Sequence, residues 1–290
     1  MASMTAAEMS ADEANDAAKL AILEDLALAA GRRIMEIYEA GVTAERKADS
    51  SPVTEADRAA EKIILQGIRA AFPGIPCVAE EETAEGRAPV ELGEAFFLVD
   101  PLDGTKEFIS RRPDFTVNIA LVRAGAPELG VVFAPANGKM FNGRPGRAEE
   151  TDIGSDFKVL ARRSIAVRRD DRPRLIVASR SHRTAETDAY IARFKGAEIV
   201  AIGSSLKFCL LASGKADIYP RFGRTMEWDT AAGDAVLRAA GGSTFTLDGK
   251  PLCYGKRNQA EDVDFANPWF VAGCDSAMRS PSMRRNVFTN

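Results

Sequence analysis

Two aspartates, Asp100 and Asp103, stand at the end of an apolar run in the segment FFLVDPLDGTKEFISR. The four apolar residues predict a buried strand that ends at Asp100, and Pro101 then turns the chain so that both carboxylates can face one point. Gly104 permits a close backbone approach, and Thr105 begins a helical pattern whose first amides suit an anion. Oxygen ligands beside such amides favour a site for Mg²⁺ and a phosphate group. Taken alone, the same string is also typical of an Asx turn.

Two further acidic clusters could complete such a site. The segment VAEEET, residues 78–83, ends an apolar strand in three adjacent acids, which usually mark a solvated loop. One of them placed beside Asp100 would complete a cation site. The segment MEWDTAAGDAVL puts Glu227 and Asp229 before a helix, where Asp229 also suits a purely structural N-cap.

The composition excludes several other chemistries. The chain has 4 cysteines without C-x-x-C spacing and 1 histidine, His182, so zinc sites and Ser-His-Asp triads are nearly excluded. With 38 Lys and Arg against 42 Asp and Glu, the net charge is −4, and a polymeric DNA or RNA partner is not expected. Neither a P-loop nor a G-x-G-x-x-G motif is present. The chemistry therefore depends on carboxylates.

No apolar stretch approaches the roughly 20 residues of a transmembrane helix, and the first residues lack the basic region of a signal peptide. We therefore expect a cytoplasmic protein. Weak attachment to the inner face of a membrane stays open as an alternative.

The hydrophobic pattern predicts two α+β units. Residues 1–150 form an N-terminal half that carries most of the candidate ligands, and residues 151–290 form an α/β half that carries Asp229 and the substrate pocket. Helices are predicted at 12–40, 55–72, 184–196, 204–215 and 228–242, and strands at 75–80, 95–100, 115–125, 129–135, 174–179, 198–203 and 216–221. Thr54 is the predicted N-cap of the second helix. Residues 137–174 are predicted to be a domain boundary or a long surface connection.

Taken in order, the segments KADSSPVTEAD, EEE, DPLDGT and EWDTAAGDAVLRAAGG resemble those of the inositol monophosphatase superfamily, whose members are magnesium-dependent, lithium-sensitive phosphomonoesterases. The resemblance covers residues 47–242 and implies an αβαβα sandwich, with two sheets and helices between and outside them. The segments DGTKEFI, ASRSH and GSSLKFCLLASGKADIYPR most resemble the bacterial 3′(2′),5′-bisphosphate nucleotidase branch. That branch removes the 3′-phosphate from 3′-phosphoadenosine 5′-phosphate, a by-product of sulfur assimilation.

The resemblance also implies a role for particular residues. The implied ligands of two or three Mg²⁺ ions are Glu80, Asp100, the carbonyl of Leu102, Asp103 and Asp229. Asp100 would bridge two ions, and Glu81 is an alternative to Glu80. Thr105 and Asp57 would orient the attacking water, while Asp49 and Glu80 would support a weaker third ion.

The implied substrate contacts form a second set. The amides of Gly104 and Thr105 would bind the scissile phosphate, and the non-scissile 5′-phosphate would lie on Ser204, Lys207 and Arg221. Glu227 and Thr225 would lie near the sugar, and His182 could contact the adenine. The alternative is that these polar residues are merely the solvated ends of a helix and a strand.

Two other functions remain open at this point. An inositol-1-monophosphatase or sugar-bisphosphate phosphatase would share the fold and the metal site but differ in the specificity pocket. A catalytically silent binding protein should lack at least one acidic ligand, whereas every acid that the site needs is present. The expected partner is a small nucleotide bisphosphate, and a homodimer is left open.

Overall fold

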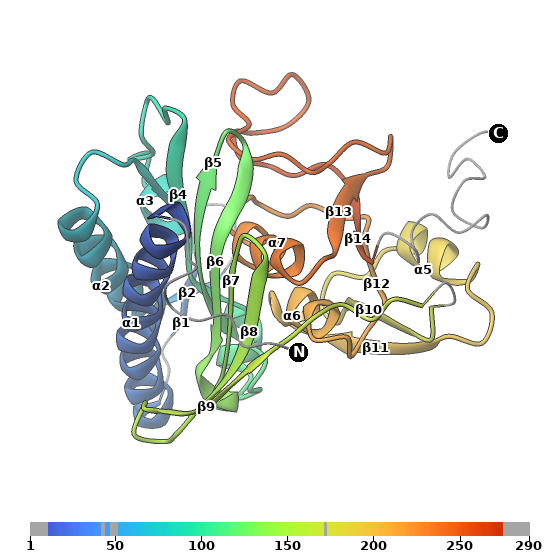
Figure 1. Cartoon of the computed structure of the whole chain (residues 1–290), viewed down its shortest axis with the longest axis horizontal. Coiled ribbons are helices and arrows are strands. Elements are labelled where there is room, and N and C mark those ends of the chain that lie inside the picture. Colours follow the sequence, from blue (N-terminus) through green and yellow to red (C-terminus); the bar gives the residue numbers. More distant parts are fainter. Residues whose placement is uncertain (1–10, 42–43, 47–51, 171–172, 275–290) are drawn as a thin grey trace.

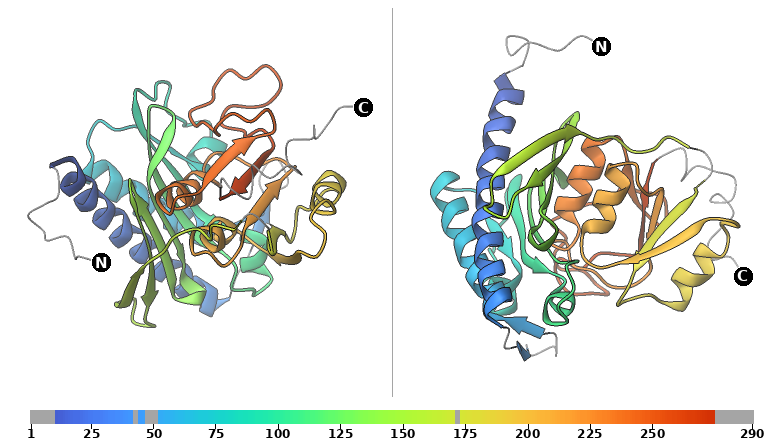
Figure 2. Two further views of the ribbon diagram at one scale, coloured as in Figure 1. Left: turned by 45° about the vertical axis from the view of Figure 1, so that its right-hand side comes forward. Right: turned by 90° about the horizontal axis from the view of Figure 1, so that it is seen from below.

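Helices and sheets alternate in five layers (Figure 1). The computed structural model describes residues 11–41, 44–46, 52–170 and 173–274. Helices α1 and α2 cover the outer face of a seven-stranded sheet, α6 and α7 lie between this sheet and a five-stranded one, and α5 lies outside the second sheet. Figure 2 shows α1 on the side of the large sheet that faces away from α7. The predicted αβαβα sandwich is confirmed.

The helices and strands have the following bounds. The helices are α1 Ala11–Ala40, α2 Glu55–Ala71, α3 Glu80–Ala84, α4 Thr105–Ile109, α5 Ala185–Ile191, α6 Leu206–Ala212 and α7 Ala231–Ala239, with a 3₁₀ turn at Pro135–Asn137. The strands are β1 Ala44–Arg46, β2 Pro52–Thr54, β3 Cys77–Ala79, β4 Ala95–Asp103, β5 Thr116–Arg123, β6 Ala126–Ala134, β7 Lys139–Arg144, β8 Arg147–Ile153, β9 Val159–Ser164, β10 Leu175–Ser179, β11 Glu198–Ile202, β12 Ile218–Arg221, β13 Ser243–Thr246 and β14 Phe270–Gly273. No helix in the described ranges combines the length and the apolar character that crossing a bilayer requires.

The large sheet contains three strands that the hydrophobic pattern did not reveal. Its order is β3-β4-β5-β6-β7-β8-β9, with every pair antiparallel except β3 and β4. Residues 137–174 were expected to be a surface connection, but β7 to β9 occupy residues 139–164. Buried Glu150 in β8 is paired with Arg163 at 2.6 Å and Lys215 at 3.1 Å, so a polar sequence is accommodated in the sheet. Strand β9 is an edge strand whose residues are all exposed, so it shows no alternation of apolar and polar side chains.

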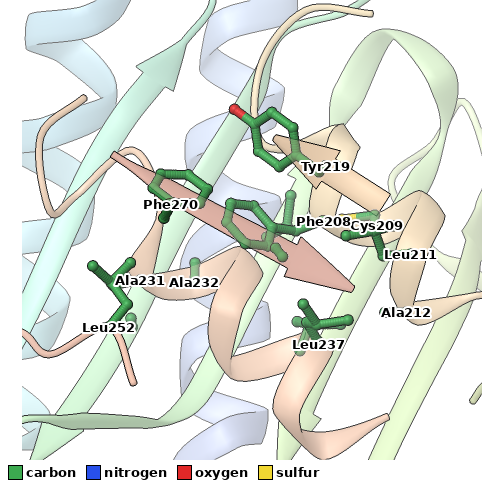
Figure 3. Packing of buried hydrophobic residues seen from close by; sticks show 14 of the residues in the cluster. Phe208, Cys209, Leu211, Ala212, Tyr219, Ala231, Ala232, Leu237, Leu252 and Phe270 are labelled. Atoms are coloured by element: carbon green, nitrogen blue, oxygen red, sulfur yellow. The ribbon is translucent and has the colours of Figure 1, made fainter. Parts of the chain in front are cut away.

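The second sheet and the central helices share one apolar core. The strand order is β11-β10-β12-β14-β13, and β10 pairs in parallel with both β11 and β12, as the α/β alternation predicted. Phe208 of α6 lies 5.4 Å from the ring of Tyr219 and 6.0 Å from that of Phe270 (Figure 3). Burying such large rings on both sides fixes α6 against the sheet. The residues at the start of α6 are thereby held in place.

Candidate active site

The sequence-predicted residues gather around a cavity of about 890 Å³ that is lined by residues from both sheets. It lies where the end of β4, the starts of α4 and α6, and the turn before α7 meet. The predicted residues that line it are Glu80, Asp100, Leu102, Asp103, Gly104, Thr105, His182, Ser204, Lys207, Arg221, Thr225 and Asp229. Residues far apart in the sequence therefore form one site.

The end of β4 supplies two aspartates, of which Asp100 is buried and Asp103 is half-buried. Asp100 is 1% exposed, and its Oδ1 accepts a hydrogen bond from the Leu102 amide at 3.0 Å. The Asx turn is therefore formed, and the carboxylate lines the cavity as well. The pairing of β4 with β5 shifts register between Asp100 and Asp103, an irregularity of the kind that re-aims side chains near active sites.

Asp229 provides the third carboxylate from the second half of the chain. Its Oδ2 accepts the Met226 amide at 2.8 Å and closes a turn before α7. The N-cap of α7 is Thr230, so the expectation that Asp229 caps this helix is wrong. The side chain is held by the turn and faces the cavity.

These three aspartates are unfavourable neighbours without a cation. Burial, followed by repulsion from Glu80 and Asp103, raises the pKa of Asp100 well above its ordinary value. Burial and the charges of Asp103 and Glu80 raise the pKa of Asp229 to about 8, and burial is also the main cause that raises the pKa of Asp103. In the described part of the chain, none of the three aspartates forms an ion pair with Lys or Arg. A cluster of neighbouring carboxylates of this kind fits a hard divalent cation.

As the side chains lie, no group of three or more acidic, histidine or cysteine side chains in the described residues is close enough to hold an ion. Metal binding would therefore draw the carboxylates closer together than they lie here. The donor set still fits Mg²⁺, because it consists of carboxylates and a backbone carbonyl around one cavity.

The first turns of α2 and α4 meet beside these acids. Thr54 caps α2 as predicted: its Oγ1 accepts the Ala56 amide at 3.1 Å. Asp57 accepts the amide and the hydroxyl of Thr54 on Oδ2, and the Thr105 hydroxyl on Oδ1 at 3.1 Å. Gly104 has a φ of +96°, and a Cβ there would lie 3.0 Å from the Asp114 carbonyl oxygen, so glycine is required.

The cavity is also lined by two buried cations, Lys207 and Arg221. Lys207 is 6% exposed; its Nζ donates to the Ser204 carbonyl and lies 5.3 Å from the centre of the Tyr219 ring. Arg221 is 7% exposed; it donates to the Arg224 carbonyl at 2.7 Å, and its Nε has no partner in the described residues. Neither side chain forms an ion pair within the described ranges. Mainly because of burial, the pKa of Lys207 is lowered to about 8.

Sequence reasoning missed several residues of the site, among them Lys106, Glu107 and Ser205. Lys106 lines the cavity, with its Nζ 3.2 Å from Nε2 of His182. Buried Glu107 accepts the Ser181 hydroxyl at 2.8 Å, and Ser205 lies among the aspartates. Lys106 and Glu107 directly follow DGT, and Ser205 follows Ser204, so adjacency to the motifs was the available signal.

Some predicted residues lie elsewhere. Glu227 is fully buried and does not line the cavity, because its carboxylate accepts the amides of Gly255 and Lys256 and the Lys256 ammonium at 2.6 Å. Its expected place near the sugar is therefore corrected to a role in anchoring residues 255–256. Glu80 lines the cavity, whereas Glu81 does not. Asp49 lies outside the described residues.

Comparison with known proteins agrees with this geometry. The model of the inositol monophosphatase family matches residues 16–271. The chain belongs to the inositol monophosphatase family. Members of this family are metal-dependent, in agreement with the carboxylate cluster.

Individual relatives within the family are also similar along most of their length. The chain is 46% identical over 247 residues to the 3′(2′),5′-bisphosphate nucleotidase CysQ of Escherichia coli K12, covering 84% of this chain and 95% of the relative. A crystal structure of CysQ from Bacteroides thetaiotaomicron superposes with a TM-score of 0.71 at 36% identity, covering 89% of this chain and 97% of that one. A Thermotoga maritima inositol monophosphatase has a TM-score of 0.71 at 24% identity, covering 92% and 95%, and shows the fold alone.

Proposed function

We propose that this chain is a 3′(2′),5′-bisphosphate nucleotidase that hydrolyses 3′-phosphoadenosine 5′-phosphate to AMP and phosphate. One observation carries the assignment to a bisphosphate: the same cavity is lined by the cluster of Asp100, Asp103 and Asp229 and by two buried cations, Lys207 and Arg221. A substrate with two phosphates can use both groups of residues at once. The identity of 46% to a nucleotidase of this name supports the same activity.

Glu80, Asp100, the Leu102 carbonyl, Asp103 and Asp229 would hold two or three Mg²⁺ ions. When bound, Mg²⁺ supplies charge neutralisation for the phosphate and lowers the pKa of a bound water. Asp57 accepts the hydrogen of the Thr105 hydroxyl, which leaves a lone pair of the Thr105 oxygen to accept a hydrogen bond from the attacking water. The Thr105 side chain would thus orient the attacking water and hold one of its protons at the Thr105 oxygen.

The two cations of the cavity would bind the 5′-phosphate. Lys207 and Arg221 are held by backbone carbonyls, so their positive charges are fixed in position without being neutralised. Such preorganised cations bind a phosphate more tightly than mobile surface lysines, since little side-chain entropy is lost. Ser204, next to them, has a φ of +49°, a backbone strain of the kind found where a site requires a particular orientation.

The proposal is tested with a substrate panel at one fixed Mg²⁺ concentration. The panel compares 3′-phosphoadenosine 5′-phosphate, AMP, inositol 1-phosphate and fructose 1,6-bisphosphate, with released phosphate as the readout. We expect the highest kcat/KM for the nucleotide bisphosphate. A higher kcat/KM for inositol 1-phosphate or for the sugar bisphosphate would overturn the nucleotidase assignment and leave the metal-dependent phosphatase.

A further inference from the structure

The hydroxyl of Ser205 lies at a junction of three chain segments. Ser205 is 2% exposed and immediately precedes α6. Its Oγ is 3.0 Å from Nδ2 of Asn118 on β5, 3.0 Å from Oδ2 of Asp103 at the end of β4, and 2.6 Å from the carbonyl oxygen of Asp229 before α7. One side chain therefore contacts the backbone of one implied metal ligand and the carboxylate of another.

The geometry determines which group donates to which. The Asn118 amide donates to Oγ, so the single hydroxyl hydrogen is left for the Asp103 carboxylate or the Asp229 carbonyl. This one hydrogen can be donated to only one of the two acceptors at a time, and both acceptors lie within 3.0 Å of Oγ. The hydroxyl thus limits how far the two residues can separate.

Asn118 sets the orientation of this contact. It pairs with Asp100 across β4 and β5, and its side chain is 1% exposed. Its Oδ1 has no hydrogen-bond partner in the described residues, so the contact that orients the amide is the one from Nδ2 to Ser205. The chain of contacts runs from the large sheet to the first residue before α6, and so spans the two halves that must meet to complete the site.

We propose that Ser205 is a positioning residue for the metal site, whose hydroxyl fixes the Asp103 carboxylate relative to the Asp229 turn across the junction of the two halves. The inference rests on the proposed metal-dependent function. Ser205 has no role in binding the substrate in this account. Its effect is on cation affinity, which can be measured without turnover.

The test uses the full chain, freed of metal with a chelator and then titrated calorimetrically with Mg²⁺. Ser205→Ala and the nearly isosteric Ser205→Cys remove the strong donor, and each should raise the Kd for Mg²⁺ about tenfold, the effect of one hydrogen bond to a charged group. Ser213→Ala is the matched control. The Ser213 hydroxyl is half-buried at the other end of α6 and donates to the Cys209 carbonyl at 2.8 Å, so its loss should leave the Kd within about twofold.

A second readout separates positioning from folding. The gain in Tm on adding Mg²⁺ should shrink in the Ser205 variants and stay at the parent value in Ser213→Ala. The positioning role is overturned if the Ser205 variants bind Mg²⁺ as the parent does, if Ser213→Ala weakens binding equally, or if both Ser205 variants fail to fold. A parent chain that binds no Mg²⁺ would instead overturn the metal site of the proposed function, and this role with it.

Discussion

The Thr105 hydroxyl donates to Oδ1 of Asp57 at 3.1 Å and so links the first turn of α4 to the first turn of α2. The other oxygen of Asp57 accepts the amide and the hydroxyl of Thr54, at 2.8 Å and 2.7 Å. A helix cap thereby holds the carboxylate that orients Thr105. The Asp57 side chain therefore both stabilises the start of α2 and takes part in the proposed mechanism.

This relationship predicts the effect of Thr105→Ala. The attacking water would lose its acceptor, so kcat should fall by about a hundredfold while KM changes less than about threefold. Thr105→Ser keeps the hydroxyl and should retain kcat within about fivefold. Steady-state kinetics at saturating Mg²⁺ measure both variants. Parent-like kcat in Thr105→Ala would contradict the water-orienting role.

Local sequence signals predicted the acidic side of the site well. The apolar run before Asp100, the proline after it and the glycine at 104 specify a turn by short-range sterics alone, and the cap at Thr54 is equally local. Glu227 could not be assigned in this way, because its partners at 255 and 256 come from a later loop that had no predicted contact with it. Strands β7 to β9 were missed because their few buried apolar residues, such as Phe141 and Ile153, stand among charged residues that are satisfied by ion pairs across the sheet.

Asp100→Asn should separate catalysis from stability. Without metal, the neutral amide relieves repulsion between buried Asp100 and the neighbouring carboxylates, so Tm in excess chelator should rise by about 2–6 °C, or roughly 1–2 kcal/mol. Phosphate release with Mg²⁺ should fall by about a thousandfold or more. Asp152→Asn is the control; this aspartate is ion-paired with Arg163 at 2.9 Å, so its loss should not raise Tm. A lower Tm together with retained activity in Asp100→Asn would refute the ligand assignment.

His182 offers a direct measurement of the charge in the cavity, because it is the single histidine of the chain. Partial desolvation of the imidazole, followed by repulsion from the charges of Arg221 and Lys106, lowers the pKa of His182 to about 4. The pKa of His182 is lower in the folded protein than the ordinary value of 6.5, so protonation of His182 favours the unfolded chain. The free energy of unfolding therefore has its full value, as far as His182 is concerned, above pH 6.5 and decreases as the pH falls toward 4.

An NMR titration of the imidazole should therefore give one resonance with a midpoint well below 6.5 in the free protein. Lys106→Met removes a neighbouring positive charge and should raise this midpoint, and a bound bisphosphate should raise it further. Lys250→Met, at a lysine whose side chain is 79% exposed, should leave it unchanged. A midpoint at or above 6.5 in the free parent would show that the cations do not act on His182.

Lys207→Met tests substrate specificity. If Lys207 binds the 5′-phosphate, removing its charge should lower kcat/KM for 3′-phosphoadenosine 5′-phosphate by roughly ten- to hundredfold, the effect of a charge-assisted contact of about 1.5–3 kcal/mol. The kcat/KM for a nucleoside 3′-monophosphate should be almost unaffected. This substrate lacks the 5′-phosphate, so it makes no contact with Lys207 that the variant could lose. Methionine preserves the stem that packs near Tyr219, so the change is mainly one of charge.

Lys215→Met is the matched control for this experiment. Lys215 lies just beyond the end of the same helix, is ion-paired with Glu150 at 3.1 Å and does not line the cavity, so its loss should alter neither substrate's kcat/KM by more than about twofold. Equal losses on the two substrates in Lys207→Met would remove Lys207 from the specificity pocket. Any preference for a bisphosphate would then have to come from Arg221 and Ser204, and Arg221→Met, measured on the same pair of substrates, tests the remaining cation.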